Sequence, residues 1–285
     1  MIFKKVHYKL SYLPKAFTLV ELLVVVAVLA LLASIVFSNL TGAREGAKIS
    51  NALSFQSQTH TLIGADLVGW WNFDEESGNT AKDISGYGNN GTIVGASRVD
   101  GVPGTGGKAL DVSGGNYYAN IPHNSTQLLI SEGTISAWIY PYTLGTSEYG
   151  RIVDKSTASD GANGFAFRLR PGSRLRFAIN LTNVDPPGLI EMDVWTHVIA
   201  TWDSEGIATT YINGKMNGNP IATGHPSGIT TTNPLRIGIT SYSTTSYAFD
   251  GLIDDIRIYS RALTASEIQT LYAQNKDKYL SEKAN

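Results

Sequence analysis

The chain has 285 residues, 22 Lys and Arg against 24 Asp and Glu, and no cysteine. The absence of cysteine excludes a disulfide scaffold, a thiolate metal site and a cysteine nucleophile, and the near-neutral charge offers no basic surface for nucleic acid. With 29 glycines, 14 tyrosines and only 16% charged residues, the composition is typical of a turn-rich, all-β protein.

The N-terminal region departs from this average. Its first 16 residues carry four lysines and no acid, which leaves 18 basic against 24 acidic residues in the rest. The next 22 residues, Phe17–Ser38, contain one ionisable group, Glu21. As a helix this segment is about 33 Å long, enough to cross a bilayer with the lysines on the cytoplasmic side. A cleaved secretory signal has a shorter apolar core, and a plain anchor does not explain a costly carboxylate inside the membrane.

The segment Lys15–Val25 resembles the class III signal of type IV pilins and type II secretion pseudopilins. The resemblance implies that a prepilin peptidase cleaves between Ala16 and Phe17 and N-methylates Phe17, although the family nearly always has glycine where Ala16 stands. It also implies that Glu21 pairs with the new N-terminal ammonium of a neighbouring subunit. The implied partners are membrane lipid before assembly, the inner-membrane assembly machinery and other pilin subunits in an extracellular filament.

Four parts of the chain are predicted. Residues 1–16 form the leader, and residues 17–64 form a membrane and assembly helix that ends near Gly64. Residues 65–275 form a β-sheet head, closed by a short helix that begins at the capping box Thr264–Glu267 and runs to about Gln274. Residues 276–285 are predicted to be a flexible tail.

Short apolar runs separated by Gly, Asn, Asp and Ser indicate that the head is built of antiparallel strands packed face to face. We expect strands at Leu67–Phe73, Gly91–Val94, Ala109–Val112, Tyr117–Ile121, Thr134–Tyr140, Arg151–Lys155, Phe165–Leu169, Leu175–Ile179, Trp195–Trp202, Ala208–Ile212, Leu235–Thr240 and Gly251–Tyr259. The segment Gly95–Gly107 is predicted to be a loop.

Several of these segments resemble, in family order, a concanavalin A-like, laminin-G-like jelly roll. The resemblance rests on Leu67–Gly78, Asp83–Thr92, Thr134–Pro141, Trp195–Asp203, Tyr211–Lys215 and Gly251–Leu263. It implies a mainly β sandwich in which the last strand lies beside the first.

The sequence does not predict an enzyme. The hydrolases of this fold carry Glu-x-Asp-x-x-Glu on one strand, whereas Glu191-Met192-Asp193 has no third acid and lies at a turn. The histidines show no paired metal-ligand or catalytic spacing. They are His7, His60, His123, His197 and His225.

A structural Ca²⁺ is the one predicted cofactor. Members of the superfamily often hold calcium between the first and last strands, and calcium prefers carboxylate and amide oxygens. The predicted ligands are Asp83, Asn90 and Asp255, with Asp74 as a further candidate. Strand alternation would place Asp254 with Leu252 and Ile256, and Asp255 could instead pair with Arg257.

A glycan-binding surface needs exposed aromatic rings and polar groups that fix the sugar. The candidate ligand contacts are Tyr117, Tyr142, Tyr242 and Tyr247. We therefore expect a pilin-like subunit, minor pilin or pseudopilin, whose head binds a glycan or a surface protein. The alternative is a membrane-anchored binding module that enters no filament.

Overall fold

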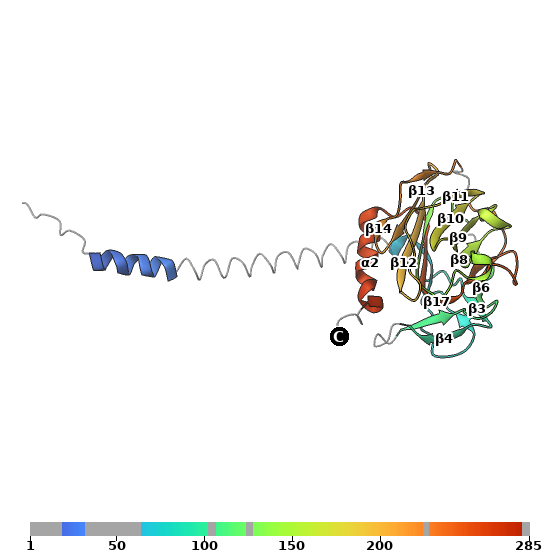
Figure 1. Cartoon of the computed structure of the whole chain (residues 1–285), viewed down its shortest axis with the longest axis horizontal. Coiled ribbons are helices and arrows are strands. Elements are labelled where there is room, and N and C mark those ends of the chain that lie inside the picture. The colour runs from blue at the N-terminus through green and yellow to red at the C-terminus, as the bar shows by residue number, and fades with distance from the viewer. Residues whose placement is uncertain (1–18, 32–63, 102–106, 124–127, 225–227, 281–285) are drawn as a thin grey trace, which may run out of the picture. The chain divides into compact units, whose positions relative to one another are not determined.

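The computed structural model describes residues 19–31, 64–101, 107–123, 128–224 and 228–280 (Figure 1). The chain divides into two units, residues 1–57 and 58–285. In the first unit, residues 19–31 are helical and their side chains are exposed. The predicted leader, Ala16, Phe17 and the remainder of the predicted span lie outside the described residues. Among the described residues, no helix is both long and apolar enough to cross a membrane.

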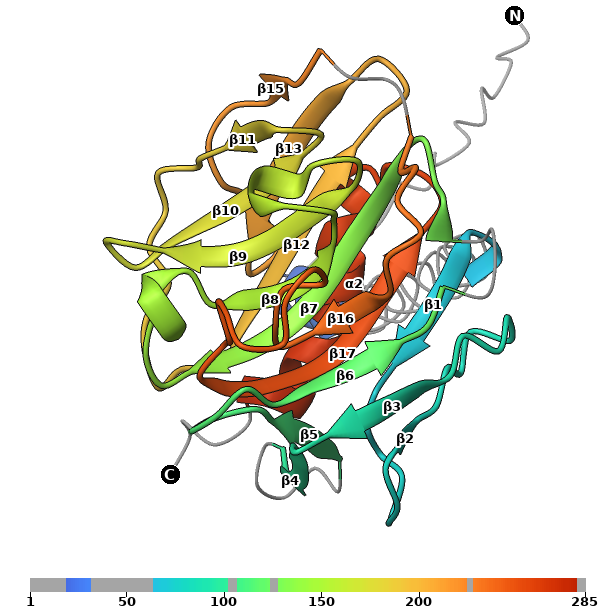
Figure 2. The same ribbon diagram turned by 90° about the vertical axis from the view of Figure 1, so that its right-hand side faces the viewer.

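The second unit is a sandwich of two antiparallel sheets, as predicted (Figure 2). The first sheet has the order β14-β13-β12-β7-β17-β5-β4, with β1 paired to β17 and β15 to β13. Its strands are β1 (Leu67–Trp71), β4 (Ser97–Asp100), β5 (Lys108–Asp111), β7 (Gly133–Pro141), β12 (Thr196–Trp202), β13 (Ile207–Ile212), β14 (Lys215–Met216), β15 (Ile221–Ala222) and β17 (Gly251–Tyr259).

The second sheet has the order β11-β10-β9-β8-β16-β6-β3-β2. Its strands are β2 (Thr80–Ala81), β3 (Gly91–Val94), β6 (Tyr118–Ile121), β8 (Arg151–Lys155), β9 (Phe165–Arg170), β10 (Arg174–Ile179), β11 (Thr182–Val184) and β16 (Leu235–Ile237). Short 3-10 turns lie at Thr146–Glu148 and Ser159–Gly161. All twelve predicted strands are present. One correction concerns Gly95–Gly107, which contains β4 because its glycines flank four residues that pair with β5.

The core lies between the two sheets and is rich in aromatic rings. The ring of Trp202 on β12 packs 5.7 Å from Phe165 and 5.5 Å from Phe177, both on the other sheet. Val198 and Ala200 share this buried face with Trp202, as alternation predicts. The rings therefore join the two sheets across the middle of the head.

The helix α2 (Ala265–Leu280) covers the outer face of the first sheet, so the head has three layers (Figures 1 and 2). Ile268 and Leu271 pack there against residues of β12, β13 and β17. The predicted capping box is present, since the Glu267 amide donates to Thr264 Oγ1 and the Thr264 amide donates to the Glu267 carboxylate. The helix continues past Gln274 into the predicted tail, because residues 275–280 contain no glycine or proline to end it.

The last strand pairs with the first, as expected, but a β-bulge changes its facing pattern. The bulge lies between Asp254 and Arg257, and Asp255 has a φ of 50°. As a result Ile253 and Ile256 both face the core, whereas Leu252 packs in a separate outer cluster. The predicted sharing of one face by Leu252, Asp254 and Ile256 is therefore wrong, because simple alternation fails across a bulge.

Candidate functional site

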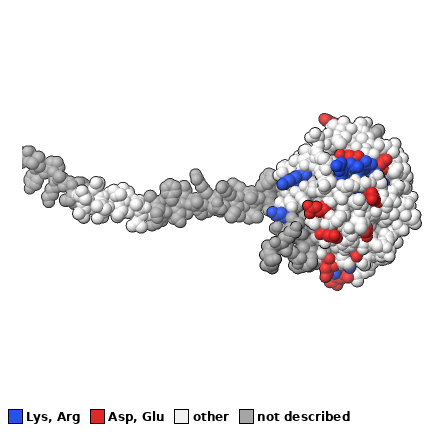
Figure 3. Space-filling view, viewed as in Figure 1, with Lys and Arg blue, Asp and Glu red and all other residues white. Residues whose placement is uncertain are grey.

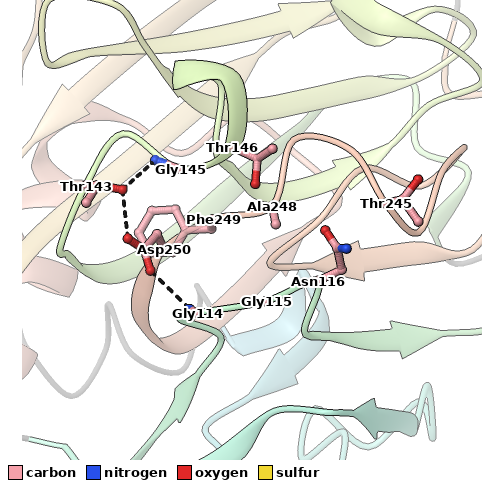
Figure 4. A pocket seen from close by; sticks show the side chains of 10 residues that line it. All are labelled: Gly114, Gly115, Asn116, Thr143, Gly145, Thr146, Thr245, Ala248, Phe249 and Asp250. Atoms are coloured by element: carbon pink, nitrogen blue, oxygen red, sulfur yellow. Dashed lines mark hydrogen bonds between the residues drawn. The ribbon is translucent and has the colours of Figure 1, made fainter.

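Three loops that are distant in sequence meet around an open pocket of about 500 Å³ (Figure 4). The loops join β5 to β6, β7 to β8, and β16 to β17, so each crosses from one sheet to the other. We call this the loop pocket. Its lining residues are Gly114, Gly115, Asn116, Thr143, Gly145, Thr146, Thr245, Ala248, Phe249 and Asp250.

The carboxylate of Asp250 connects the three loops. Its Oδ1 accepts a hydrogen bond of 3.2 Å from the Gly114 amide, and its Oδ2 accepts one of 2.8 Å from Thr143 Oγ1. Thr143 Oγ1 in turn accepts from the Gly145 amide at 3.1 Å (Figure 4). Each carboxylate oxygen has two lone pairs, so Asp250 can still accept hydrogen bonds from a ligand.

Glycine makes the close approach of these loops possible. Gly145 has a φ of 77°, and a Cβ there would lie 2.3 Å from the Ala248 carbonyl oxygen. Gly114, with a φ of 74°, turns the chain where its amide meets Asp250. Both positions need the left-handed backbone that glycine adopts readily. The polar groups of the pocket are therefore held in place by backbone geometry.

The surroundings of the loop pocket are acidic. Burial raises the pKa of the Tyr142 hydroxyl, and nearby Asp111, Tyr140, Asp193 and Asp250 raise it further. The Tyr142 amide also donates to the Asp250 carbonyl at 2.8 Å. Such a site favours ligands that donate hydrogen bonds, as sugar hydroxyl groups do, over ligands that carry negative charge.

The predicted tyrosines do not form one surface. Tyr117 is 38% exposed and its ring lies close against Gly115 of the loop pocket. Tyr142 is 39% exposed and precedes Thr143 of the pocket, so these two border it. Tyr247 lies over the guanidinium of Arg151 instead, and Tyr242 is half-buried. None of the four lines the pocket, although Tyr117, Tyr142 and Tyr247 each adjoin a lining residue in the chain.

Two of the predicted calcium ligands, Asp83 and Asn90, are in direct contact. The buried Asp83 carboxylate accepts hydrogen bonds from the amides of Trp70, Ser85 and Asn89. Asn90 is exposed and its Oδ1 accepts from the Asp83 amide at 2.8 Å.

The two other predicted ligands have different partners again. Asp255 is paired with Arg257 at 2.9 Å, the alternative that the sequence left open, and accepts from the indole of Trp70 at 2.7 Å. Asp74 is exposed and accepts from the Lys108 amide. No group of three or more His, Cys, Asp or Glu within the described part of the chain is arranged to hold a metal. Calcium binding stays a prediction.

The acids considered for catalysis lie at a turn, as the sequence indicates. Glu191 and Asp193 are exposed in the segment before β12, and Asp193 has a φ of 56°. His197 is buried on β12 and its Nε2 lies 2.8 Å from Ser136 Oγ. Burial lowers the pKa of His197 to about 3, so the imidazole is neutral and lies beneath α2 rather than in the loop pocket.

A family model described as the concanavalin A-like lectin/glucanases superfamily matches residues 113–269, more than half of the chain. The chain belongs to this superfamily. A second model, the prokaryotic N-terminal methylation motif, matches residues 14–37. The protein thus joins a pilin-like N-terminal methylation motif to a lectin-like head, as the sequence predicted. No curated protein matches the chain.

Solved structures share the fold of the lectin-like head. The binding domain of Paraclostridial Mosquitocidal Protein 1 is 20% identical, with a TM-score of 0.57 over 74% of this chain and 53% of that one. Domain 4 of an arabinanase from Geobacillus stearothermophilus, solved with arabinotriose, is 21% identical, with a TM-score of 0.51 over 73% of this chain and 98% of that one. A botulinum neurotoxin type C structure is 18% identical, with a TM-score of 0.55 over 75% and 52%.

The chain therefore spans about half of the two toxin chains and almost all of the arabinanase domain. Sequence reasoning named Tyr117 and Tyr142, which adjoin the pocket in the chain, but none of its lining residues Asp250, Thr143 and Asn116, which lie on irregular loops. The Gly114-Gly115-Asn116 turn was the one signal that marked a close backbone approach.

Proposed function

We propose that this protein is a pilin-like subunit that displays a carbohydrate-binding head on the cell surface. The methylation motif supports the first half of this proposal, with cleavage between Ala16 and Phe17 by a prepilin peptidase. In the described helical segment, the apolar side chains are between 45% exposed, at Val25, and 77% exposed, at Leu19. Such a surface requires a lipid or protein environment.

Glu21 gives this apolar segment its proposed assembly role. Its side chain is exposed on the helix of residues 19–31. In the proposal it pairs with the N-terminal ammonium of a neighbouring subunit when helices pack in a filament. A buried charge is tolerated when it is paired, and the pair fixes the register of the two helices.

The loop pocket is the proposed glycan site, and the position of Asp250 carries the assignment. This carboxylate joins three loops and keeps free acceptor capacity, and the exposed Tyr117 and Tyr142 lie on two of those loops. Aromatic faces with a few fixed polar groups suit a neutral sugar. The related arabinanase domain was solved with arabinotriose, which supports a sugar as the ligand. We assign no catalysis to the head.

A glycan array tests this proposal with the full chain in detergent. The wild-type protein should bind a set of neutral glycans, and Asp250→Ala should lose them. Asp203→Ala is the matched control, because Asp203 also holds a turn by accepting from the amides of Glu205 and Ile207. Absence of binding on a broad array, or equal loss in both variants, would remove the loop pocket as a glycan site.

A further inference from the structure

Three arginines form a row across the outer face of the second sheet. Arg151 on β8 is directly opposite Arg168 on β9, and Arg168 is directly opposite Arg176 on β10. Their strand neighbours Phe167 and Phe177 face the core, so the arginines face away from it. Like charges in opposed positions destabilise a sheet, so this arginine row carries an energetic cost.

Two guanidinium groups of the row are buried with unused donors. The Arg151 side chain is 0% exposed, and its Nε donates to Asp154 at 2.9 Å. Its two Nη atoms have no hydrogen-bond partner within the described residues, and neither does Nε of Arg168. Burial, followed by the charge of Arg151, lowers the pKa of Arg168. Buried charged donors without acceptors are costly, and an acceptor from outside would relieve that cost.

Two tyrosines cover these guanidinium groups. Tyr247 lies 5.0 Å from the Arg151 guanidinium carbon, Tyr149 lies 5.4 Å from that of Arg168, and the two rings meet edge to face. Both tyrosines are on loops, and Tyr247 has a φ of 59°. The residue before Tyr149, Glu148, has a φ of 63°. Residues other than glycine are strained at positive φ, so holding the two tyrosine rings over the guanidinium groups costs free energy.

The arginine row is locally positive on a head whose chain is acidic outside the leader. Arg170, Arg174 and Arg236 lie on the same face, which also carries Asp154, Asp160 and Asp185. Figure 3 shows Lys and Arg surface bordered by acidic surface over the part of the head that contains β10 and β11. Six arginines against three aspartates leave an excess of positive charge for an anionic ligand.

We propose that the arginine row binds a carboxylate group of an acidic glycan. The planar guanidinium fork of Arg151 matches a carboxylate with two parallel hydrogen bonds, and Arg168 adds its free Nε. Tyr149 and Tyr247 move off the guanidinium groups, and their rings then border the bound sugar. This inference rests on the proposed function only in taking the ligand to be a glycan, because the arginine row is a different site from the acidic loop pocket.

Binding of an oligogalacturonate and of its methyl ester to the full chain in detergent tests this inference. The two ligands differ only at the carboxyl group, which is charged in the acid and carries a neutral methyl ester in the other, so the free acid should bind about tenfold or more tightly at low salt. Arg168→Gln and Arg176→Gln should each abolish that preference. Lys215→Gln, which removes the same charge from β14 on the other sheet, should retain it.

Additional variants test the hydrogen-bond geometry of the arginine row and its separation from the loop pocket. Arg168→Lys keeps the charge but removes the Nε–H donor and should also lose the preference, while thermal unfolding shows that each variant is folded. Asp250→Ala should keep the preference even if neutral-sugar binding is lost, which separates this site from the loop pocket. Equal binding of acid and ester, an equal loss in Lys215→Gln, or tighter binding of polyglutamate or a sulfated oligosaccharide would overturn the proposal.

Discussion

The Nε2 atom of His197 lies 2.8 Å from Ser136 Oγ, in a buried contact between β12 and β7. The imidazole also stacks on the rings of Trp138 and Tyr272, at 4.9 and 5.9 Å. Burial lowers its pKa from 6.5 to about 3, with smaller opposing effects from Asp255 and Arg257. The folded head therefore keeps this ring neutral under conditions in which the unfolded chain protonates it.

The stability of the head should consequently depend on pH. Between pH 6.5 and 3 the unfolded state binds a proton at His197 that the folded state does not. The free energy of unfolding should therefore fall as the pH decreases, by about 1.4 kcal/mol per unit from this group. Thermal unfolding at several pH values should show a weaker dependence in His197→Gln. Ser136→Ala, which retains the imidazole, should keep the wild-type dependence; an unchanged slope in His197→Gln would contradict this account.

Asp83→Ala should destabilise the head without any involvement of calcium. The substitution leaves the amides of Trp70, Ser85 and Asn89 without their acceptor, which should cost about 1–3 kcal/mol. Tryptophan fluorescence during thermal unfolding measures the loss. The decrease in Tm should be the same with and without EDTA. A decrease that EDTA alone reproduces in the wild type would instead indicate a calcium ion at this loop.

Gly145→Ala should damage the head more than the same change at Gly172. Both glycines have positive φ, 77° and 79°, so each substitution carries about 1–2 kcal/mol of backbone strain. A Cβ at Gly172 meets nothing within 4 Å, whereas at Gly145 it would lie 2.3 Å from the Ala248 carbonyl oxygen. Gly145→Ala should therefore show the larger decrease in Tm, and it should also lose glycan binding. Equal effects of the two substitutions would show that the loop pocket tolerates wider spacing.

Glu21→Ala should reduce incorporation into surface filaments while leaving the protein in the membrane. The proposed pairing of Glu21 with a neighbouring N-terminus disappears, and with it the contact that fixes register. Leu19→Ala, a change at an exposed apolar neighbour, is the control. Immunoblots of sheared filaments and membranes measure the distribution. Unchanged incorporation and cleavage would leave only the membrane-anchored module.

The strands of the head could be predicted from the sequence because most of them alternate between polar and apolar residues or are uniformly apolar. Alternation along β12 places Val198, Ala200 and Trp202 on one face, and all three are in the core. The bulge at Asp254 and Asp255 was not readable, because neither residue type demands a positive φ. The two-residue strands such as Thr80–Ala81 are too short to carry a periodic signal.

The sites were harder to predict because they depend on contacts between distant loops. The Gly114 amide donates to the Asp250 carboxylate although the two residues are 136 positions apart in the sequence, and no local sequence pattern predicts such a contact. The arginine row likewise arises from strand register, which places Arg151 beside Arg168 and Arg168 beside Arg176. Residue type and a loop position in the sequence do not say what a tyrosine packs against, so they do not predict that Tyr247 covers an arginine.

Retention of sheared surface filaments on beads that carry a glycan selected by the array tests the central claim most directly. Filaments from wild-type cells should be retained and should contain this protein, and those from cells with Asp203→Ala should behave alike. Filaments from cells with Asp250→Ala should contain the protein but pass through. Retention that is independent of Asp250, or absence of the protein from wild-type filaments, would contradict a filament-borne head that binds glycans through the loop pocket.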